Sequence, residues 1–342
     1  MRVALYILGG FGLLFVGAEV LVRGASRLAA LMKIPPVVIG LTVVAFGTSA
    51  PELAVSVLSA SRGASGIAVG NVVGSNIFNL LAILGLVAFI RPLAIHSRVV
   101  WRDMPIMVSV SGLAYILAWD GVVSSTEGLV LAAGLPLFVF FMRGAEPEVG
   151  EGSSFPIREG LPSVLVQIAI VVLGLVILVV GSRALVTGST ELAALLGFSE
   201  LLIGLTLVAA GTSLPELATS LVAAYRKEED IAVGNVVGSN VFNLLGVLGI
   251  AAMVSPLEVT EASLLLDFPV MLGAALLSLV FLASGSRVSR SEGAFLLISF
   301  VLYTSYLFLD ASGAVLPSSN ITWLAVALVV GLSWVIWSNR RV

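Results

Sequence analysis

One segment of this 342-residue chain occurs twice, and the second copy follows the first at a constant offset of 164 residues. Residues 39–86 and 203–250 align without a gap, and 32 of the 48 aligned positions are identical. Both copies contain the string Gly-Thr-Ser-x-Pro-Glu and, further on, Gly-Asn-Val-Val-Gly-Ser-Asn-x-Phe-Asn. Two copies of one unit predict internal pseudosymmetry, in which matching residues meet where the halves of the chain pack together.

The composition places both copies in a membrane. Apolar side chains make up 59% of the chain and charged ones only 11%, whereas a soluble domain has about 45–50% and about 25%. Apolar runs of roughly 18 or more residues recur, as in a polytopic membrane protein. The chain has no cysteine and one histidine, which excludes disulfides and argues against a zinc site, and its net charge of −3 suggests no nucleic-acid partner.

The predicted fold is an all-α polytopic membrane protein with eleven spans. The first apolar run lacks a convincing cleavage site, so it is interpreted as an uncleaved span rather than a signal peptide. The expected spans are 3–22, 37–60, 68–90, 103–119, 122–142, 162–185, 201–224, 231–254, 264–283, 292–309 and 321–338.

The repeat extends beyond the duplicated segment, and each half is expected to contain five spans. Because five is odd, the second half would enter the membrane in the opposite direction, which is typical of transporters with a substrate site near the midplane. The predicted organisation is a first half (1–142), a cytoplasmic linker (143–160), an inverted second half (161–310) and an extra C-terminal helix (311–342).

The basic residues predict the orientation. With the N-terminus outside, 14 of the 17 Lys and Arg residues fall in inner loops or in the C-terminal tail. Only Arg2, Arg62 and Arg183 then fall outside. The sequence therefore predicts a multi-pass protein of the cell membrane, plasma or inner, with a cytoplasmic C-terminus.

Glu52 and Glu216 occupy matching positions near the middle of the second and seventh predicted spans. A carboxylate at that depth costs at least about 2.5 kcal/mol, and such residues usually face a cavity and serve an ion or proton path. The alternative is a protonated glutamate buried in a helix contact, and two such residues at symmetric positions argue against it. Pro51 and Pro215 stand next to them and predict a break in each helix.

Oxygen atoms accompany each carboxylate. Hydroxyls lie three and four residues before each glutamate and share its helix face, and the third and eighth spans each add a Ser and an Asn four residues apart. The prolines are expected to free backbone carbonyls near each break. Such hard oxygen ligands suit calcium or sodium rather than a soft metal. Besides Glu52 and Glu216, the expected ligands are Thr48, Ser49, Thr212, Ser213, Ser75, Ser239, Asn79 and Asn243, with the carbonyls of Ala45 and Ala209.

The doubled motif resembles the α-repeats of the cation/calcium exchanger superfamily and is most similar to its sodium/calcium exchanger branch, of prokaryotic type. The resemblance implies an antiporter, not an enzyme, that exchanges Na⁺ for Ca²⁺ by alternating access. It implies Na⁺ and Ca²⁺ as the transported ions and the lipid bilayer as the surroundings. It implies no cofactor and no protein partner. It also implies that the oxygen ligands named above form the sodium and calcium sites, and that the first and sixth spans slide across the remaining helices.

Alternatives remain open from the residues themselves. A proton/calcium or broader divalent cation exchanger is the alternative within transport, although the proton-coupled branch of the superfamily has different glutamate-containing strings in its third and eighth spans. Some relatives, including potassium-dependent ones, carry Asp where Asn243 stands, so the resemblance argues against potassium dependence here. A membrane protease would need a nucleophile–base pair or an aspartate pair, and the symmetric aspartates Asp103 and Asp267 lie at span ends. A passive channel is the third alternative.

Overall fold

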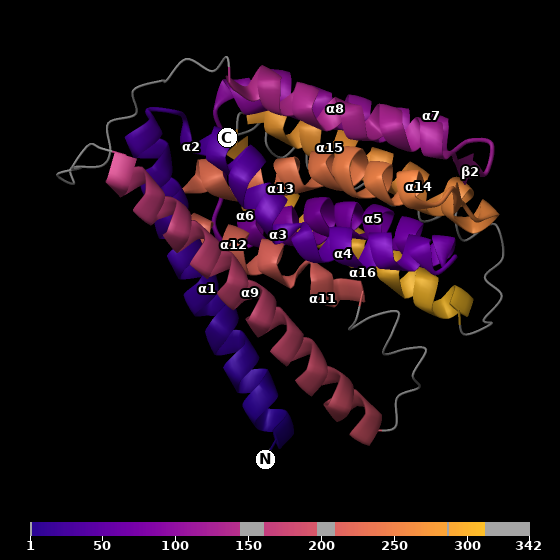
Figure 1. Cartoon of the computed structure of the whole chain (residues 1–342), viewed down its shortest axis with the longest axis horizontal. Helices are drawn as coiled ribbons and strands as arrows, with labels where there is room; N and C mark the ends of the chain where they lie inside the picture. Colours follow the sequence, from indigo (N-terminus) through magenta and orange to yellow (C-terminus); the bar gives the residue numbers. More distant parts are fainter. Residues whose placement is uncertain (1, 144–160, 197–208, 286, 312–342) are drawn as a thin grey trace.

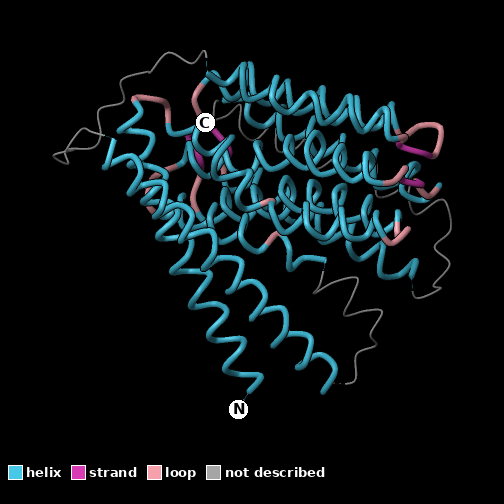
Figure 2. The backbone as a smooth tube through the Cα atoms, viewed as in Figure 1, coloured by secondary structure: helices cyan, strands magenta, loops and turns pink. Residues whose placement is uncertain are grey.

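The computed structural model describes residues 2–143, 161–196, 209–285 and 287–311, and these are almost entirely helical (Figure 2). Within these ranges, seven helices are long and apolar enough to cross a membrane. A bent helix pair over residues 36–61 makes an eighth candidate span. The prediction of an all-α polytopic membrane protein is confirmed. The predicted span 321–338 lies outside the described residues.

In the first half, helices occupy the five predicted spans, and four of these spans are long and apolar enough to cross a membrane, the exception being 103–119. The first helix continues ten residues beyond the predicted end at residue 22. Short π-helical turns interrupt several spans and are labelled η. The elements are α1 (Arg2–Met32), α2 (Pro36–Ile39), η1 (Gly40–Val44), α3 (Ala45–Thr48), α4 (Ala50–Ser61), α5 (Ser65–Ile77), η2 (Phe78–Ile83), α6 (Leu84–Ile90), β1 (Leu93–Ala94), η3 (Val99–Asp103), α7 (Met104–Leu117), β2 (Val122–Val123) and α8 (Ser125–Arg143).

The second half repeats this order. Strands β1 and β3 begin 164 residues apart, as do the π-helical turns η3 and η6, so the sequence offset is also an offset of secondary structure. The elements are α9 (Leu161–Leu195), α11 (Ala209–Thr212), α12 (Leu214–Tyr225), α13 (Glu229–Phe242), η5 (Asn243–Leu248), α14 (Gly249–Val254), β3 (Leu257–Glu258), η6 (Ser263–Asp267), α15 (Phe268–Gly285), β4 (Arg287–Val288) and α16 (Arg290–Ala311).

Two antiparallel ribbons join the halves. Strand β1 pairs with β4 through Leu93 and Val288, and β2 pairs with β3 through Val123 and Leu257. The ribbons lie at opposite ends of the helical bundle (Figure 2). Matching strands β1 and β3 are therefore at opposite ends, which is the relation expected between halves that run in opposite directions.

Helix α13 forms the centre of the bundle (Figure 1). Every residue from Ile231 to Gly249 is buried, and glycines allow neighbouring backbones to approach closely. A Cβ atom added at Gly238 would lie 2.5 Å from the carbonyl oxygen of Leu41 on η1. Small residues of this kind are how membrane helices pack without a large hydrophobic driving force. The polar residues of the second copy of the repeat, on α13 and η5, are thus enclosed by other helices.

Helices α1 and α9 lie side by side and cross the remaining bundle at a steep angle (Figure 1). Glycines again mark the contact, because a Cβ atom at Gly17 would lie 2.8 Å from the backbone nitrogen of Leu178. A Cβ atom at Gly174 would lie 2.7 Å from the backbone nitrogen of Leu21. The two helices thus form a tight pair, one from each half of the chain.

Candidate cation site

The predicted helix breaks are present in both halves. Helix α3 ends at Thr48 and α4 begins after Ser49, with a bend of 45°. Ser213 separates α11 from α12 in the same way, and its backbone angles (φ −89°, ψ 7°) nearly equal those of Ser49 (φ −82°, ψ 6°). A proline follows each break within the first helical turn, where its missing N–H is tolerated. Each break therefore places a serine and a glutamate on one short turn.

The two breaks contact each other through reciprocal hydrogen bonds. Ser49 Oγ donates to Glu216 Oε1 at 3.0 Å, and Ser213 Oγ donates to Glu52 Oε1 at 2.9 Å. Both glutamates are buried, and the second oxygen, Oε2, of each accepts no hydrogen bond from the described residues. A buried carboxylate oxygen without a donor is unfavourable unless it is protonated or meets a cation. The geometry brings two such oxygens to one region between the halves.

The hydroxyls of Thr48 and Thr212 lie beside this pair. Thr48 Oγ1 donates to Asn235 Oδ1 at 3.1 Å, and Thr212 Oγ1 donates to Asn71 Oδ1 at 3.3 Å. Both contacts join opposite halves of the chain. The sequence reasoning assigned no role to Asn71 or Asn235, although both lie 19 residues after a glutamate in the identical string of each copy.

The amides of Asn79 and Asn243 are buried near the start of the π-helical turns η2 and η5. Turns of this type often mark functional sites, because they leave backbone groups and side chains in unusual directions. Neither amide atom of Asn79 has a hydrogen-bond partner among the described residues. Asn243 Nδ2 donates to Asn76 Oδ1 at 3.2 Å, and its Oδ1 has no such partner. Each Asn thus has a carbonyl oxygen available, but only Asn243 is oriented by a neighbour.

Two further predicted ligands, Ser75 and Ser239, are also buried on α5 and α13. The Oγ of Ser239 has no hydrogen-bond partner within the described ranges. Ten of the twelve predicted ligand residues have side-chain oxygens. These residues lie at the two breaks and on the two spans that follow them, 65–90 and 229–254. The remaining two were expected to contribute backbone carbonyls.

The break does not leave the carbonyl of Ala45 without a helical donor, and its role as a ligand stays a prediction. Its oxygen accepts the Ser49 N–H at 3.0 Å and the Thr48 hydroxyl at 3.3 Å. Pro51 removes the donor of the carbonyl four residues before it, which is that of Gly47. A carbonyl oxygen has two lone pairs, so the Ser49 N–H leaves one of them for the Thr48 hydroxyl or for a cation. Ala209 begins α11, and its side chain lies outside the described part of the structure.

In the second half, the carbonyl of Gly211 corresponds to that of Gly47, and it accepts a hydrogen bond from a residue to which the sequence reasoning assigned no role. Ser182 Oγ on α9 donates to the carbonyl oxygen of Gly211 at 2.6 Å, four residues before Pro215. The equivalent residue on α1 is Ala18, which has no hydroxyl. The two halves therefore differ in how the tight pair of α1 and α9 contacts the breaks.

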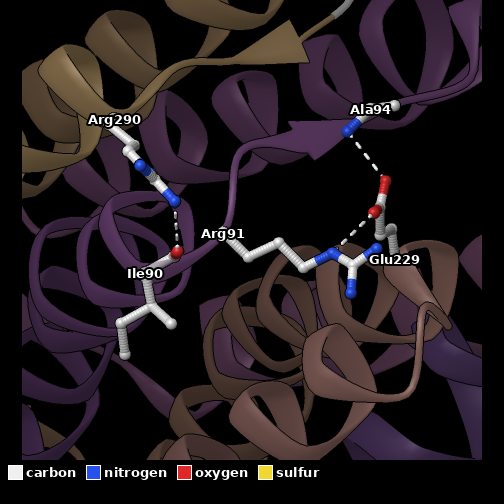
Figure 3. Close-up of polar contacts among 5 residues, drawn as sticks. All are labelled: Ile90, Arg91, Ala94, Glu229 and Arg290. Atoms are coloured by element: carbon white, nitrogen blue, oxygen red, sulfur yellow. Dashed lines mark hydrogen bonds and ion pairs between the residues drawn. The ribbon is translucent and has the colours of Figure 1, made fainter.

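Charged groups join the start of the central helix and its neighbours to the first half (Figure 3). Glu229, at the start of α13, accepts hydrogen bonds from Arg91 Nε at 3.2 Å and from the backbone N–H of Ala94 at 2.9 Å. A carboxylate at a helix N-terminus is also favoured by the helix dipole. Arg290 donates to the carbonyl of Ile90 at 3.4 Å. These contacts join α6 and β1 of the first half to α13 and α16 of the second.

The symmetric aspartates are engaged elsewhere. Asp103 Oδ1 accepts from Arg102 Nε at 2.8 Å, and Asp267 Oδ1 accepts from the Tyr303 hydroxyl at 2.7 Å. They contribute to neither break. Across the described residues, no group of three or more His, Cys, Asp or Glu side chains could hold a metal ion. The candidate site thus consists of two carboxylates surrounded by neutral oxygens, a donor set that suits a hard cation.

Comparison with known proteins extends this picture. A family model described as sodium/calcium exchanger protein matches residues 2–144 and 166–309. The chain is 39% identical over 312 residues to a putative antiporter, CaxA, from Alkalimonas amylolytica, and the match covers 89% of this chain and 98% of that protein. It is 33% identical over 349 residues to the sodium/calcium exchanger MaX1 from Methanosarcina acetivorans, with coverage of 89% and 98%. A structure of the sodium-calcium exchanger NCX_Mj, soaked with Na⁺ and Sr²⁺, superposes with a TM-score of 0.78 at 32% identity and covers 89% of this chain and 98% of that one.

Proposed function

The chain belongs to the sodium/calcium exchanger protein family, and from this membership we propose that it is a secondary-active antiporter that exchanges Na⁺ for Ca²⁺ across the membrane by alternating access. One observation carries the proposal. The carboxylates of Glu52 and Glu216, from opposite halves, are buried together and bonded to each other's serine, with one oxygen of each left without a donor among the described residues.

In this proposal the transported ion binds between the two breaks. Calcium takes six to eight oxygen ligands, and sodium accepts the same hard donors. Glu52 and Glu216 supply the charge, and neutral oxygens complete the coordination. These neutral ligands are the side chains of Thr48, Ser49, Thr212, Ser213, Ser75, Ser239, Asn79 and Asn243, and the backbone carbonyls of Ala45 and Ala209.

The charge of the site explains why transport would be an exchange. Two carboxylates balance one divalent or two monovalent cations. Without a cation, two negative charges close together in a poorly solvated site repel each other strongly. The empty protein would therefore rarely change its side of access, and a Ca²⁺ ion would leave only when Na⁺ replaces it.

A proton/calcium exchanger is the second candidate, because glutamates can also carry protons. The neutral hydroxyl and amide oxygens around the carboxylates favour sodium, since a proton needs no such coordination. Calcium uptake into vesicles, with Na⁺, K⁺ and H⁺ gradients imposed separately, distinguishes the two. We expect uptake only with an opposing Na⁺ gradient, and uptake driven by a pH gradient alone would support proton coupling. Leak without any counter-cation would indicate a channel.

The domain organisation belongs to the same proposal. Residues 1–142 and 161–310 would be inverted halves, joined by the linker 143–160, with 311–342 as an appended helix. The N-terminus would lie outside the cell and the C-terminus in the cytoplasm. The position of the matching strands β1 and β3 at opposite ends of the bundle supports the inverted arrangement.

A further inference from the structure

Two asparagines outside the proposed ligand set connect the ligands to one another. Asn235 on α13 is fully buried, and its counterpart Asn71 on α5 is half-buried. The two positions are 164 residues apart, so they correspond in the repeat. Each side chain lies between a glutamate-bearing helix of its own half and a threonine of the other half.

The contacts of Asn235 use both ends of its amide. Its Nδ2 donates to the backbone carbonyl of Glu216 at 3.3 Å and to Ser220 Oγ at 3.0 Å. Its Oδ1 accepts the hydroxyl proton of Thr48 at 3.1 Å. One side chain therefore ties the backbone of one carboxylate ligand to the side chain of a ligand from the other half.

The same arrangement occurs around Asn71. Its Nδ2 donates to the backbone carbonyl of Glu52 at 3.1 Å and to Ser56 Oγ at 2.9 Å. Its Oδ1 accepts the hydroxyl proton of Thr212 at 3.3 Å. Two independent copies of one hydrogen-bond pattern indicate a shared role rather than an incidental contact.

The direction of each hydrogen bond follows from the chemistry of the groups. A backbone carbonyl can only accept, so the NH₂ group of each Asn must face the glutamate backbone. The amide oxygen then faces the threonine, and because this oxygen can only accept, the threonine hydroxyl is the donor in that contact. A hydroxyl that has given its proton to a neighbour has its lone pairs free, whereas one that points its proton at a cation repels it.

We propose that Asn71 and Asn235 are positioning residues that accept the hydroxyl protons of Thr212 and Thr48 and thereby present both threonine oxygens to the transported cation. The inference rests on the proposed function, in which these threonines are ligands. Each Asn acts through a threonine and does not touch the ion. Thr48 has two other acceptors within reach, the Ala45 carbonyl at 3.3 Å, which already accepts the Ser49 N–H, and the Glu216 carboxylate, which already accepts the Ser49 hydroxyl.

A double-mutant cycle tests the coupling. Equilibrium Ca²⁺ binding is measured on the purified full-length protein for wild type, Thr48→Val, Asn235→Leu and the double variant. We expect each single substitution to lower the affinity about fivefold to tenfold, as for the loss of one favourable hydrogen-bonded ligand. The double variant should bind no more weakly than the weaker single variant, because both changes remove the same oxygen from the ion.

The control is Ser111→Ala, which removes a buried hydroxyl that donates only to its own helix, at the Met107 carbonyl. Its Ca²⁺ affinity should equal that of wild type. Losses that add in the double variant, or an Asn235→Leu protein with wild-type affinity, would overturn the inference. Thermal unfolding without Ca²⁺ checks that each variant is folded. If Asn235→Leu does not fold, the half-buried Asn71 and Thr212 provide the same cycle.

Failure of the proposed function has a different signature. In that case the wild-type protein itself binds no Ca²⁺, and the inference about both asparagines falls with it. If the wild type binds and Glu216→Gln does not, the site stands, and the coupling between Asn235 and Thr48 alone decides the inference.

Discussion

The hydroxyl of Ser49 donates a hydrogen bond to Glu216, 167 residues further along the chain, at 3.0 Å. The reciprocal bond from Ser213 to Glu52 measures 2.9 Å. Each carboxylate is therefore held by the helix break of the opposite half, and neither half can build the pair alone. A site made in this way changes when the halves move relative to each other, which is the physical requirement for a transporter whose access alternates between the two sides of a membrane.

Replacing either glutamate by glutamine should abolish calcium transport. Glu52→Gln and Glu216→Gln keep the size of the side chain and remove one of the two negative charges that would balance Ca²⁺. Neither change introduces a charge into the membrane, so both proteins should remain folded. Sodium-driven Ca²⁺ uptake into vesicles measures the effect, and Glu258→Gln on the exposed end of β3 is the matched control. Retained flux in either site variant would count against this site.

Removing a single serine hydroxyl should weaken the site without destroying it. Ser49→Ala takes the donor from Glu216, and Ser213→Ala takes it from Glu52. A hydrogen bond to a charged group contributes about 1.5–3 kcal/mol, so the Ca²⁺ concentration at half-maximal uptake should rise by about tenfold or more. The pseudosymmetry predicts similar effects for the two variants. A large effect at one serine and none at the other would show that only one carboxylate binds the ion.

The sequence located the two helix breaks because proline and a membrane-embedded carboxylate have strong local consequences. Pro51 and Glu52 recur as Pro215 and Glu216, and the repeat alone indicated that these positions meet. The sequence could not identify the hydrogen-bond partner of each serine and threonine hydroxyl at the breaks. Thr48 and Asn235 are 187 residues apart, and their contact depends on the rotation that relates the halves, which no local pattern records.

The errors in the sequence reasoning have a similar origin. Freed carbonyls were expected from Ala45 to Gly47, but the helix before Ser49 continues far enough for Ala45 to accept the Ser49 N–H, and the carbonyl that loses its donor to Pro51 is that of Gly47. The bond between Ser182 and Gly211 was missed because Ser182 lies on a strongly apolar helix, where a lone serine usually bonds its own backbone. Such hydrogen bonds depend on how whole helices pack against one another. The identity of a single residue in the sequence does not predict that packing.

The hydroxyl of Ser182 should stabilise the contact between α9 and the second break. Pro215 leaves the Gly211 carbonyl without its helical donor, and Ser182 supplies one at 2.6 Å. Ser182→Ala would leave a buried carbonyl unsatisfied, at a cost of about 1–3 kcal/mol, and should lower the unfolding temperature of the purified protein. The mirror variant Ala18→Ser offers the same hydroxyl to the first half. An unchanged unfolding temperature in Ser182→Ala would mean that another group replaces the serine.

The predicted orientation can be tested directly because the chain contains no cysteine. Arg62 lies just before α5, whereas β1 follows α6 at the other end of the same span and pairs with β4, which contains Arg287. The two arginines are thus at opposite ends of the bundle, and the basic residues place Arg62 outside and Arg287 inside. In intact cells, a membrane-impermeant thiol reagent should label Arg62→Cys. It should label Arg287→Cys only after permeabilisation. Labelling of both from the outside would contradict the inverted arrangement, whereas the reverse pattern would keep the arrangement and invert the orientation.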